Sequence, residues 1–483
     1  MAIRPIGGAE LTVSRIRFLL DGKTDVETGA RAIGTALELL REHLGRTGTK
    51  EGCAEGDCGA CTILLGELDG ERVAWRAVNA CILFAPMLDG KAVLTIESLA
   101  RGGVLHPVQR AMADGHGSQC GFCTPGFVMS LYGRSIGAVG TEGVAVKDVV
   151  AGNLCRCTGY GPILAAGEAN PPGMRDDAKV AALLRCLPPA TEGDGWFKPQ
   201  TADALAALLL DHPEARIVAG ATDVGLWVTK AMRELGTVIF IGDVADLRGI
   251  EESDTGLTLG AGVRYSDARA ALARLHPDLG ELVRRIGGVQ VRNSGTIGGN
   301  IANGSPIGDT PPALIALGAT LTLRHGDERR TMPLEDYFLR YGKQHRLPGE
   351  FLESVFIPRP APDALIRITK LSKRFDSDIS AVCGAFALRI IDGAVAEARV
   401  AFGGMAGTPK RAAACEAALT GSAWSKATIE AAAAALSQDY QPLSDLRGSS
   451  AYRLAVAANL LRRLWHETQR GEPVSVLDET LDG

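Results

Sequence analysis

Apolar and polar positions at the start of the chain predict a hairpin, a helix and a second hairpin. In "IRFLLDGKTDVET" two strand-like runs flank a turn at Asp21-Gly22. "GTALELLREHL" has helical periodicity, with its leucines on one face. After a glycine-rich loop, "CTILLGELDGERVAWRAVNAC" is typical of another hairpin, turning at Asp69-Gly70. This order of elements predicts a β-grasp fold.

The pattern then becomes helical, is interrupted, and resumes as a mixture of helices and strands. "HPVQRAMADG" and "PGFVMSLYGRS" are predicted helices, the second with Pro125 in its first turn. From Ala169 to Trp196, prolines, glycines and charges indicate a linker, with one short helix at residues 179–186. Beyond it, "PQTADALAALLLDHPEARIVAGATDVGLWV" predicts a helix, a strand and a turn at Gly220.

Composition places the chain among large globular proteins. With 483 residues, it is too long for one core, and three or more folding units are expected. Its net charge of −5 gives no indication of a nucleic-acid or membrane partner. The sequence has no membrane-spanning run, and "MAIRPIGGAELTVSRIRFLLDGK" lacks the features of a secretory signal. We therefore expect a cytoplasmic protein.

Eight of the 11 cysteines fall between Cys53 and Cys157, which favours metal ligands over structural disulfides. The first four have the plant-type spacing for a [2Fe–2S] cluster: Cys53, Cys58, Cys61 and Cys81. The loop's glycines permit the positive φ angles and close backbone approach that such a cluster requires. The alternatives are structural zinc and unrelated buried thiols, although zinc sites normally use two paired knuckles.

The second four cysteines form a CxxC and a CxC pair: Cys120, Cys123, Cys155 and Cys157. Each pair is expected at a helix terminus, where the positive end of a helix favours the thiolate form. Taken alone, the CxxC pair could be a redox dithiol and the CxC pair could bind zinc. Beside the first set, a second [2Fe–2S] cluster is the favoured interpretation.

These motifs resemble a known family. "GTKEGCAEGDCGACT", "NAC", "GSQCGFCTPG" and "NLCRCTGY" look like the iron–sulfur region of the molybdenum hydroxylases. In that family a plant-type domain precedes an α-helical cluster domain. The resemblance implies that all eight cysteines are ligands of two [2Fe–2S] clusters.

Two glycine-rich segments are candidates for a second cofactor. "RIVAGATDVG" has the shape of a phosphate-binding loop, although such turns are common. "RNSGTIGGNIANGSPIGD" surrounds its glycines with Ser, Thr and Asn and precedes the helix-like "PPALIALGA", which favours a large ligand over a simple turn.

Both segments resemble the FAD-contacting segments of the same family, and "FGGMAGTPKRAAACEAALTG" resembles its C-terminal flavoprotein subdomain. The resemblance places Ile286 at the isoalloxazine face, where animal relatives have an aromatic residue. The FAD contacts that it implies are Ile217, Val218, Ala219, Gly220, Ala221, Thr222, Asp223, Val224, Ile286, Thr296, Ile297, Gly298, Gly299, Asn300, Asp309, Leu352 and Lys370.

The implied fold class is α+β multidomain. The predicted units are a β-grasp [2Fe–2S] ferredoxin domain (13–97), a helical [2Fe–2S] bundle (98–168), a linker (169–192), an α+β FAD-binding domain (193–364) and an α+β C-terminal flavoprotein subdomain (365–483).

The resemblance implies an electron-transfer subunit of a xanthine dehydrogenase. Electrons would pass from a molybdopterin centre through the two clusters to FAD and then to NAD⁺. No residues remain for a molybdopterin domain, so that centre is expected on a larger partner subunit, in a heterotetramer of two small and two large chains. Catalytic residues for hydroxylation are not expected here. The alternatives are an aldehyde or other purine hydroxylase subunit and a stand-alone redox module.

Overall fold

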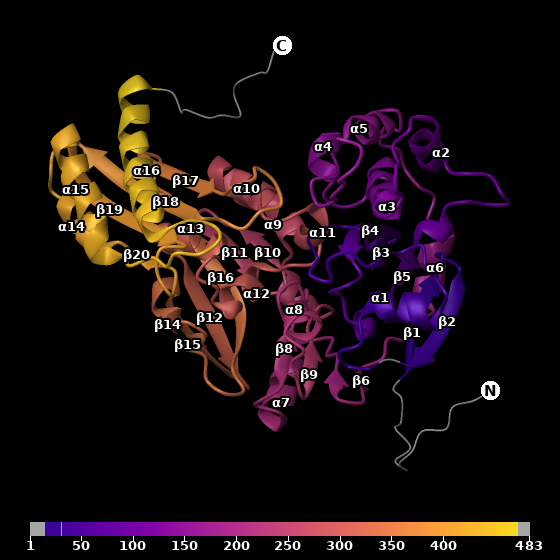
Figure 1. The fold of residues 1–483 in the computed structure, drawn as a ribbon. Helices are drawn as coiled ribbons and strands as arrows, with labels where there is room; N and C mark the ends of the chain where they lie inside the picture. Colours follow the sequence, from indigo (N-terminus) through magenta and orange to yellow (C-terminus); the bar gives the residue numbers. More distant parts are fainter. Residues whose placement is uncertain (1–14, 30, 472–483) are drawn as a thin grey trace. The chain divides into compact units, whose positions relative to one another are not determined.

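The computed structural model describes residues 15–29 and 31–471 (Figure 1). Residues 13–14 and 472–483, the outer ends of the first and last predicted domains, lie outside this range. The chain divides into two compact units. Unit 1 comprises the described parts of Met1–Leu208, Glu214–Val244 and Gly288–Ser294; unit 2 comprises Leu209–Pro213, Ala245–Gly287 and Gly295–Gly483. The architecture is mixed α/β in both.

Unit 1 begins with a five-stranded sheet in the order β2-β1-β5-β3-β4. Its strands are β1 (Arg15–Leu20), β2 (Thr24–Gly29), β3 (Thr62–Asp69), β4 (Arg72–Asn79) and β5 (Ala92–Leu94). Both predicted hairpins are present, and only the β1–β5 pair is parallel. The predicted helix is α1 (Ala36–Glu38), which continues as a π-helix over Leu39–His43. The leucine periodicity predicted the helix but not its wider winding.

The helices that follow pack partly against this sheet and partly against one another. They are α2 (Pro107–Asp114), α3 (Thr124–Ser135), α4 (Val146–Val149), α5 (Gly161–Glu168) and α6 (Ala178–Arg185). Phe127 and Leu131 of α3 share a core with Leu64 of β3. Helix α6 lies within the predicted linker, and its Val180 and Leu184 belong to the same core.

Unit 1 also contains a four-stranded sheet, in the order β6-β7-β9-β8. Its elements are β6 (Glu192–Gly193), β7 (Trp196–Phe197), β8 (Arg216–Val218), α8 (Val224–Thr229) and β9 (Val238–Phe240), with α7 (Ala202–Asp211) in the connection. Trp196, Val218 and Phe240 share one hydrophobic core with Phe18 and Phe84 of the first domain. The short helix α11 (Val289–Arg292) packs on β4.

A buried group of charges joins the same two parts of unit 1. Lys198, with a side chain 2% exposed, lies 2.8 Å from Asp243 and 3.3 Å from Asp89. Lys91 lies 2.8 Å from Glu67 and 3.2 Å from Asp243. Burial alone would raise the pKa of Asp243, but Lys91 and Lys198 lower it well below its ordinary value. The Asp243 carboxylate therefore stays ionised and holds the two lysines in place.

Unit 2 contains two larger sheets. The first has the order β10-β11-β16-β12-β13, with strands Ile250–Glu252, Gly256–Gly260, Phe351–Pro358, Thr320–His325 and Glu328–Pro333. The second has the order β17-β18-β19-β20, with strands Ala364–Leu371, Val382–Ile391, Ala394–Gly403 and Lys410–Arg411. A small hairpin pairs β14 (Phe338–Arg340) with β15 (Lys343–Gln344).

The helices of unit 2 cover these sheets (Figure 1). They are α9 (Tyr265–Leu275), α10 (Pro277–Arg284), α12 (Ile297–Asn303), α13 (Thr310–Ala316), α14 (Ala413–Leu419), α15 (Lys426–Asp439) and α16 (Ser450–Arg470). Helices α14 and α16 pack on strands β19 and β18 respectively, and α10 and α13 also pack on this sheet. Within the described range, no helix is both long and apolar enough to cross a membrane.

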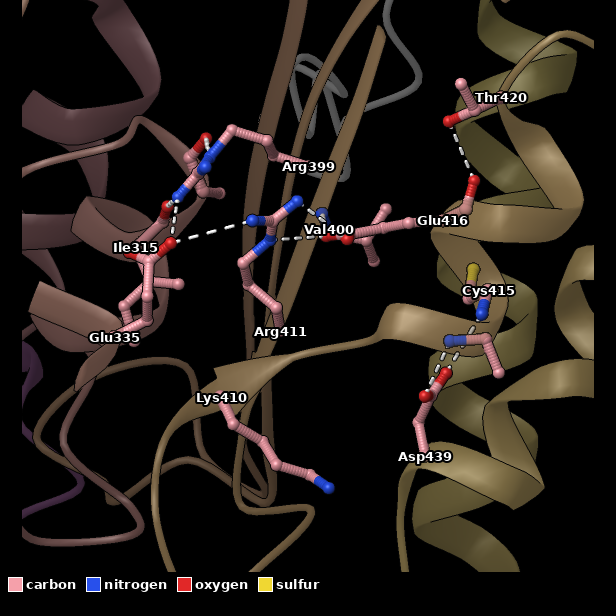
Figure 2. Close-up of polar contacts among 12 residues, drawn as sticks. Ile315, Glu335, Arg399, Val400, Lys410, Arg411, Cys415, Glu416, Thr420 and Asp439 are labelled. Atoms are coloured by element: carbon pink, nitrogen blue, oxygen red, sulfur yellow. Dashed lines mark hydrogen bonds and ion pairs between the residues drawn. The ribbon is translucent and has the colours of Figure 1, made fainter. Parts of the chain in front are cut away.

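Figure 2 shows how the C-terminal helices are fixed to the second sheet. Glu416 of α14 accepts hydrogen bonds from the Val400 amide of β19 (2.7 Å) and from Arg411 (2.8 Å). Arg411 also lies 3.6 Å from Glu335. At the end of α15, the Asp439 carboxylate accepts a hydrogen bond (3.0 Å) from the Cys415 amide in the first turn of α14. Negative charge at a helix N-terminus is favourable, so this contact stabilises the α14–α15 pair.

Candidate iron–sulfur and flavin sites

The four cysteines of the first set lie together in unit 1. Hydrogen bonds from Cys58 and Cys81 lower the pKa of Cys53, while the same contacts raise the pKa values of Cys58 and Cys81. Cys81 also contacts Cys61. Cys61 and Cys81 are buried, 1% and 3% exposed, whereas Cys53 and Cys58 are half-buried. The contacts Cys53–Cys58, Cys53–Cys81 and Cys61–Cys81 thus connect the four sulfurs into one donor set.

The backbone of this loop fits an iron–sulfur cluster. Gly56 and Gly59 have positive φ angles of 78° and 68°. A Cβ on Gly59 would lie 2.3 Å from the Gly152 carbonyl oxygen, so a side chain has no room there. The amides of Glu55 and Cys58 both donate to the Cys53 sulfur at 3.4 Å. Amide donors to sulfur are a feature of cluster loops, because they stabilise thiolate charge.

The second set also comes together in unit 1. Cys123 contacts Cys155, and Cys120 contacts Cys157. Burial, with the Cys155 contact, raises the pKa of Cys123 to about 12. The Thr158 amide donates to the Cys155 sulfur at 3.5 Å. Cys123 is the N-cap of α3, as the prediction of cysteines at helix ends requires, and the CxC pair precedes α5.

Among residues 15–29 and 31–471, no three His, Cys, Asp or Glu side chains surround a single ion position. A [2Fe–2S] cluster does not need such a group, because each of its irons takes two of the four cysteine sulfurs. The donor sets and the loop backbone both fit that requirement.

The two cysteine loops are joined directly. The Leu154 amide, next to Cys155, donates to the Cys58 carbonyl oxygen at 2.9 Å. Gly126 of α3 lies against the same loop, since a Cβ there would be 2.2 Å from the Gly59 carbonyl oxygen. The backbone of one loop therefore contacts the backbone of the other.

The first flavin segment also lies in unit 1. Ile217 and Val218 end β8, residues 219–223 form a loop, and Val224 begins α8. Ala221 has a positive φ of 58°, as an anion-binding turn often has, and burial raises the pKa of Asp223.

Helix α8, which follows this loop, packs on the first cysteine loop. A Cβ on Gly225 would lie 2.8 Å from Ile82, the neighbour of Cys81. Thr229 donates to the Ala54 carbonyl oxygen at 2.6 Å. The candidate flavin loop and the first cysteine loop are thus built into one core.

The remaining flavin candidates lie in unit 2. Thr296 caps α12 by accepting the Gly299 amide (2.9 Å), and Thr310 donates to Asn300 (2.5 Å). Ile297 is buried in the core. A Cβ on Gly298 would lie 2.4 Å from Ala261, so this glycine is also required by packing within the protein.

Asp309 and Lys370 form a buried ion pair at 2.6 Å. Ser380 donates to the second Asp309 oxygen at 2.5 Å. Leu352, 6% exposed, belongs to the nearby core, against which Ile286 packs partly buried. The resemblance assigned Asp309 and Lys370 separately to the FAD contacts and did not predict an ion pair between them.

Three segments of the chain match known families. Residues 95–168 match a family described as a [2Fe-2S] binding domain, and residues 190–360 match the FAD binding domain in molybdopterin dehydrogenase. Residues 367–468 match the CO dehydrogenase flavoprotein C-terminal domain. A solved structure of carbon monoxide dehydrogenase from Hydrogenophaga pseudoflava is 31% identical, with a TM-score of 0.53 over 57% of this chain and 96% of that one. This chain belongs to the molybdenum hydroxylase family.

Other members of the molybdenum hydroxylase family match nearly the whole chain. Xanthine dehydrogenase of Emericella nidulans is 31% identical over 94% of the chain, and xanthine dehydrogenase/oxidase of Rattus norvegicus is 30% identical over 91%. The chain spans 38% of the length of each of these relatives. The family assignment confirms the predicted resemblance, and the matched families confirm a [2Fe–2S] binding domain and an FAD-binding domain.

Sequence reasoning missed a group of buried polar residues that bridges the two cysteine loops: Thr62, Ser130, Asn153 and Gln290. Asn153 stands in the motif "GNLCRC", two residues before Cys155, and that position was its only local signal. Gln290 lies far away in the flavin-like sequence, so nothing local connected it with the cysteines.

Proposed function

We propose that the chain is the iron–sulfur/FAD electron-transfer subunit of a xanthine dehydrogenase. In this proposal all eight cysteines of the two sets are ligands of two [2Fe–2S] clusters. A molybdopterin centre on a larger partner subunit supplies electrons, and NAD⁺ receives them as the final acceptor. The proposed assembly has two copies of each subunit, and the proposed domains are those expected from the sequence.

The observation that carries the proposal is the direct junction of the two cysteine loops in one core. The Leu154–Cys58 hydrogen bond places the two donor sets on adjoining backbone. A zinc site or a redox dithiol would not require such a junction, whereas transfer between two centres depends on their fixed proximity. Clusters carry single electrons, and a flavin takes two and releases them as hydride.

The packing of α8 supports the proposed order of the centres. Thr229 and Gly225 connect the candidate FAD loop with Ala54 and Ile82, beside the ligands of the first set. The first set is therefore proposed to stand next to FAD, and the second set to receive electrons from the partner. Cys120 and Cys157 of the second set are exposed, which leaves that end of the pathway accessible to another chain.

The segment from Lys370 to Val382 is proposed to admit the nicotinamide. Arg285 donates to the Lys370 carbonyl oxygen (2.8 Å) and stacks 4.5 Å from the Phe375 ring. Arg374 is exposed beside them and donates its amide to Asp378. This anchored loop with exposed charges is suited to select a charged acceptor.

The test is spectroscopic and kinetic on the purified chain. We expect about four irons per chain and two distinct electron-spin-resonance signals on reduction. Cys58→Ser is expected to remove one signal, and Cys123→Ser the other. The matched control is Cys186→Ser, because Cys186 is exposed and belongs to neither set. It is expected to leave both signals unchanged.

With its cofactors, the chain alone is expected to oxidise NADH with an artificial dye and not to hydroxylate xanthine. Xanthine oxidation with NAD⁺ reduction should appear only after a molybdopterin-bearing partner is added. Zinc in place of iron, or xanthine turnover by the isolated chain, would contradict the proposal. If the complex oxidises an aldehyde and not xanthine, the proposed substrate is wrong, but the proposed electron-transfer role stands.

A further inference from the structure

A glutamine from the flavin-like part of the sequence lies between the two cysteine loops of unit 1. Gln290, in α11, is 1% exposed. Its Nε2 donates to Asn153 Oδ1 (3.0 Å), Thr62 Oγ1 (3.1 Å) and Ser130 Oγ (3.2 Å). Thr62 follows Cys61, Asn153 stands two residues before Cys155, and Ser130 lies on α3, the helix that Cys123 caps. One amide therefore contacts the surroundings of both donor sets.

The protons of Ser130, Thr62 and Asn153 are engaged within this group and with the neighbouring Gly59. The Ser130 hydroxyl donates to Asn153 Oδ1 (2.7 Å), and the Thr62 hydroxyl donates to the Gly59 carbonyl oxygen (2.6 Å). Asn153 Nδ2 also donates to Gly59 (3.1 Å). Three buried oxygen atoms thus converge on Gln290 Nε2, and its two protons are shared among them.

The position is tightly enclosed. A Cβ on Gly152 would lie 2.2 Å from Gln290 Oε1, and a Cβ on Gly288 would lie 2.4 Å from the Gly152 Cα. Gln290 Oε1 accepts no hydrogen bond from any described residue. A buried acceptor without a donor is unfavourable, so the contacts of Nε2 must outweigh this cost. Asn293, on the next turn, also anchors the segment by donating to the Ala77 carbonyl oxygen at 3.0 Å.

We infer that Gln290 is a positioning residue that fixes the separation and orientation of the two clusters. It does so by fixing the positions of the Gly59–Thr62 segment, Ser130 of α3 and Asn153 relative to one another. The inference rests on the proposed function, in which both cysteine sets carry clusters. The inference goes beyond the proposed function because Gln290, which lies outside both predicted cluster domains, sets the geometry between the two clusters.

The test compares Gln290→Met with Gln200→Met in the intact, cluster-loaded chain. Methionine has a similar volume but cannot donate to the three oxygens. Gln200 is a matched control, because it is a half-buried amide of unit 1 that donates one hydrogen bond, to the Lys198 carbonyl oxygen. The readout is the magnetic interaction between the two reduced clusters, seen as splitting and broadening of their spin-resonance signals at low temperature.

We expect Gln290→Met to keep about four irons per chain but to shift or lose the inter-cluster splitting. Gln290→Glu should have a larger effect, since a carboxylate would face three acceptors. Gln200→Met should match the parent spectrum. Ser130→Ala removes one of the three acceptors, together with its own hydrogen bond to Asn153, and serves as a milder variant if Gln290→Met loses iron. It should shift the splitting in the same direction.

Two outcomes would overturn the inference, and they can be told apart. If Gln290→Met and Ser130→Ala both keep the parent splitting at full iron content, Gln290 does not position the clusters and the proposed function stands. If the parent protein itself contains fewer than two clusters, the proposed function fails and the inference fails with it.

Discussion

Breaking the buried Asp309–Lys370 pair should destabilise unit 2 and weaken flavin retention. In Asp309→Ala the Lys370 ammonium, with a side chain 3% exposed, loses a carboxylate 2.6 Å away. The Ser380 hydroxyl loses its acceptor as well. Removing one partner of a buried pair costs about 3–5 kcal/mol, because the remaining charge is left uncompensated. At about 2–3 kcal/mol per molar urea, the unfolding midpoint should fall by roughly 1–2.5 M.

Glu430→Ala is the matched control. Glu430 also forms a close ion pair, 2.6 Å from Arg462, but its side chain is 46% exposed. Exposed pairs contribute little to stability because water screens them, so the urea midpoint should barely move. After gel filtration, Asp309→Ala should retain much less FAD than Glu430→Ala. Equal midpoints and equal FAD content in the two variants would refute both the energetic argument and the placement of the flavin site.

A double variant separates stability from flavin contact. Asp309→Leu/Lys370→Met replaces the pair by apolar groups, and such replacements of buried pairs are often neutral. We expect its urea midpoint to return close to that of the parent while FAD retention stays low. Recovery of both properties together would mean that the pair supports the fold of unit 2 and does not contact the flavin.

Two further predictions concern unit 1. Gly59→Ala should lose the spin-resonance signal of the first cluster, because its Cβ would lie 2.3 Å from the Gly152 oxygen; Gly70→Ala, with a similar positive φ but nothing within 4 Å, should keep it. Because the folded pKa of Asp243 is lowered by Lys91 and Lys198, its contribution to stability is present above the ordinary value of 3.8 and is lost as the pH falls below it. In acid unfolding followed by the fluorescence of buried Trp196, Asp243→Asn should lower stability at pH 7 and flatten the pH dependence below about 4. A parallel acid transition in Asp243→Asn, or loss of the cluster signal in Gly70→Ala, would contradict these expectations.

Local patterns predicted local structure well. The hairpins around Asp21-Gly22 and Asp69-Gly70 follow from alternation and turn chemistry, and the cysteine sets follow from spacing. Long-range pairings were not predictable in this way. Nothing near Lys198 indicates that it pairs with Asp89, and nothing near Gln290 indicates a partner such as Thr62, because these contacts join residues more than 100 positions apart. They depend on tertiary packing, which short-range sequence patterns do not predict.

The predicted linker is packed into the shared core of unit 1. Prolines, glycines and charges between residues 169 and 192 predicted a linker between separate domains, with one short helix in it. In the structure, Asp177 of this segment accepts the Trp75 indole N–H at 2.7 Å, and α6 packs into the core. Beyond it, Trp196 and Phe240 pack with Phe84. Side chains in such cores interdigitate at close packing, so relative motion would separate apolar surfaces and the buried lysines from their carboxylates. The first cysteine loop and the loop after β8 are therefore held at one fixed geometry by packing. An electron pathway needs that constancy, and a loose linker could not provide it.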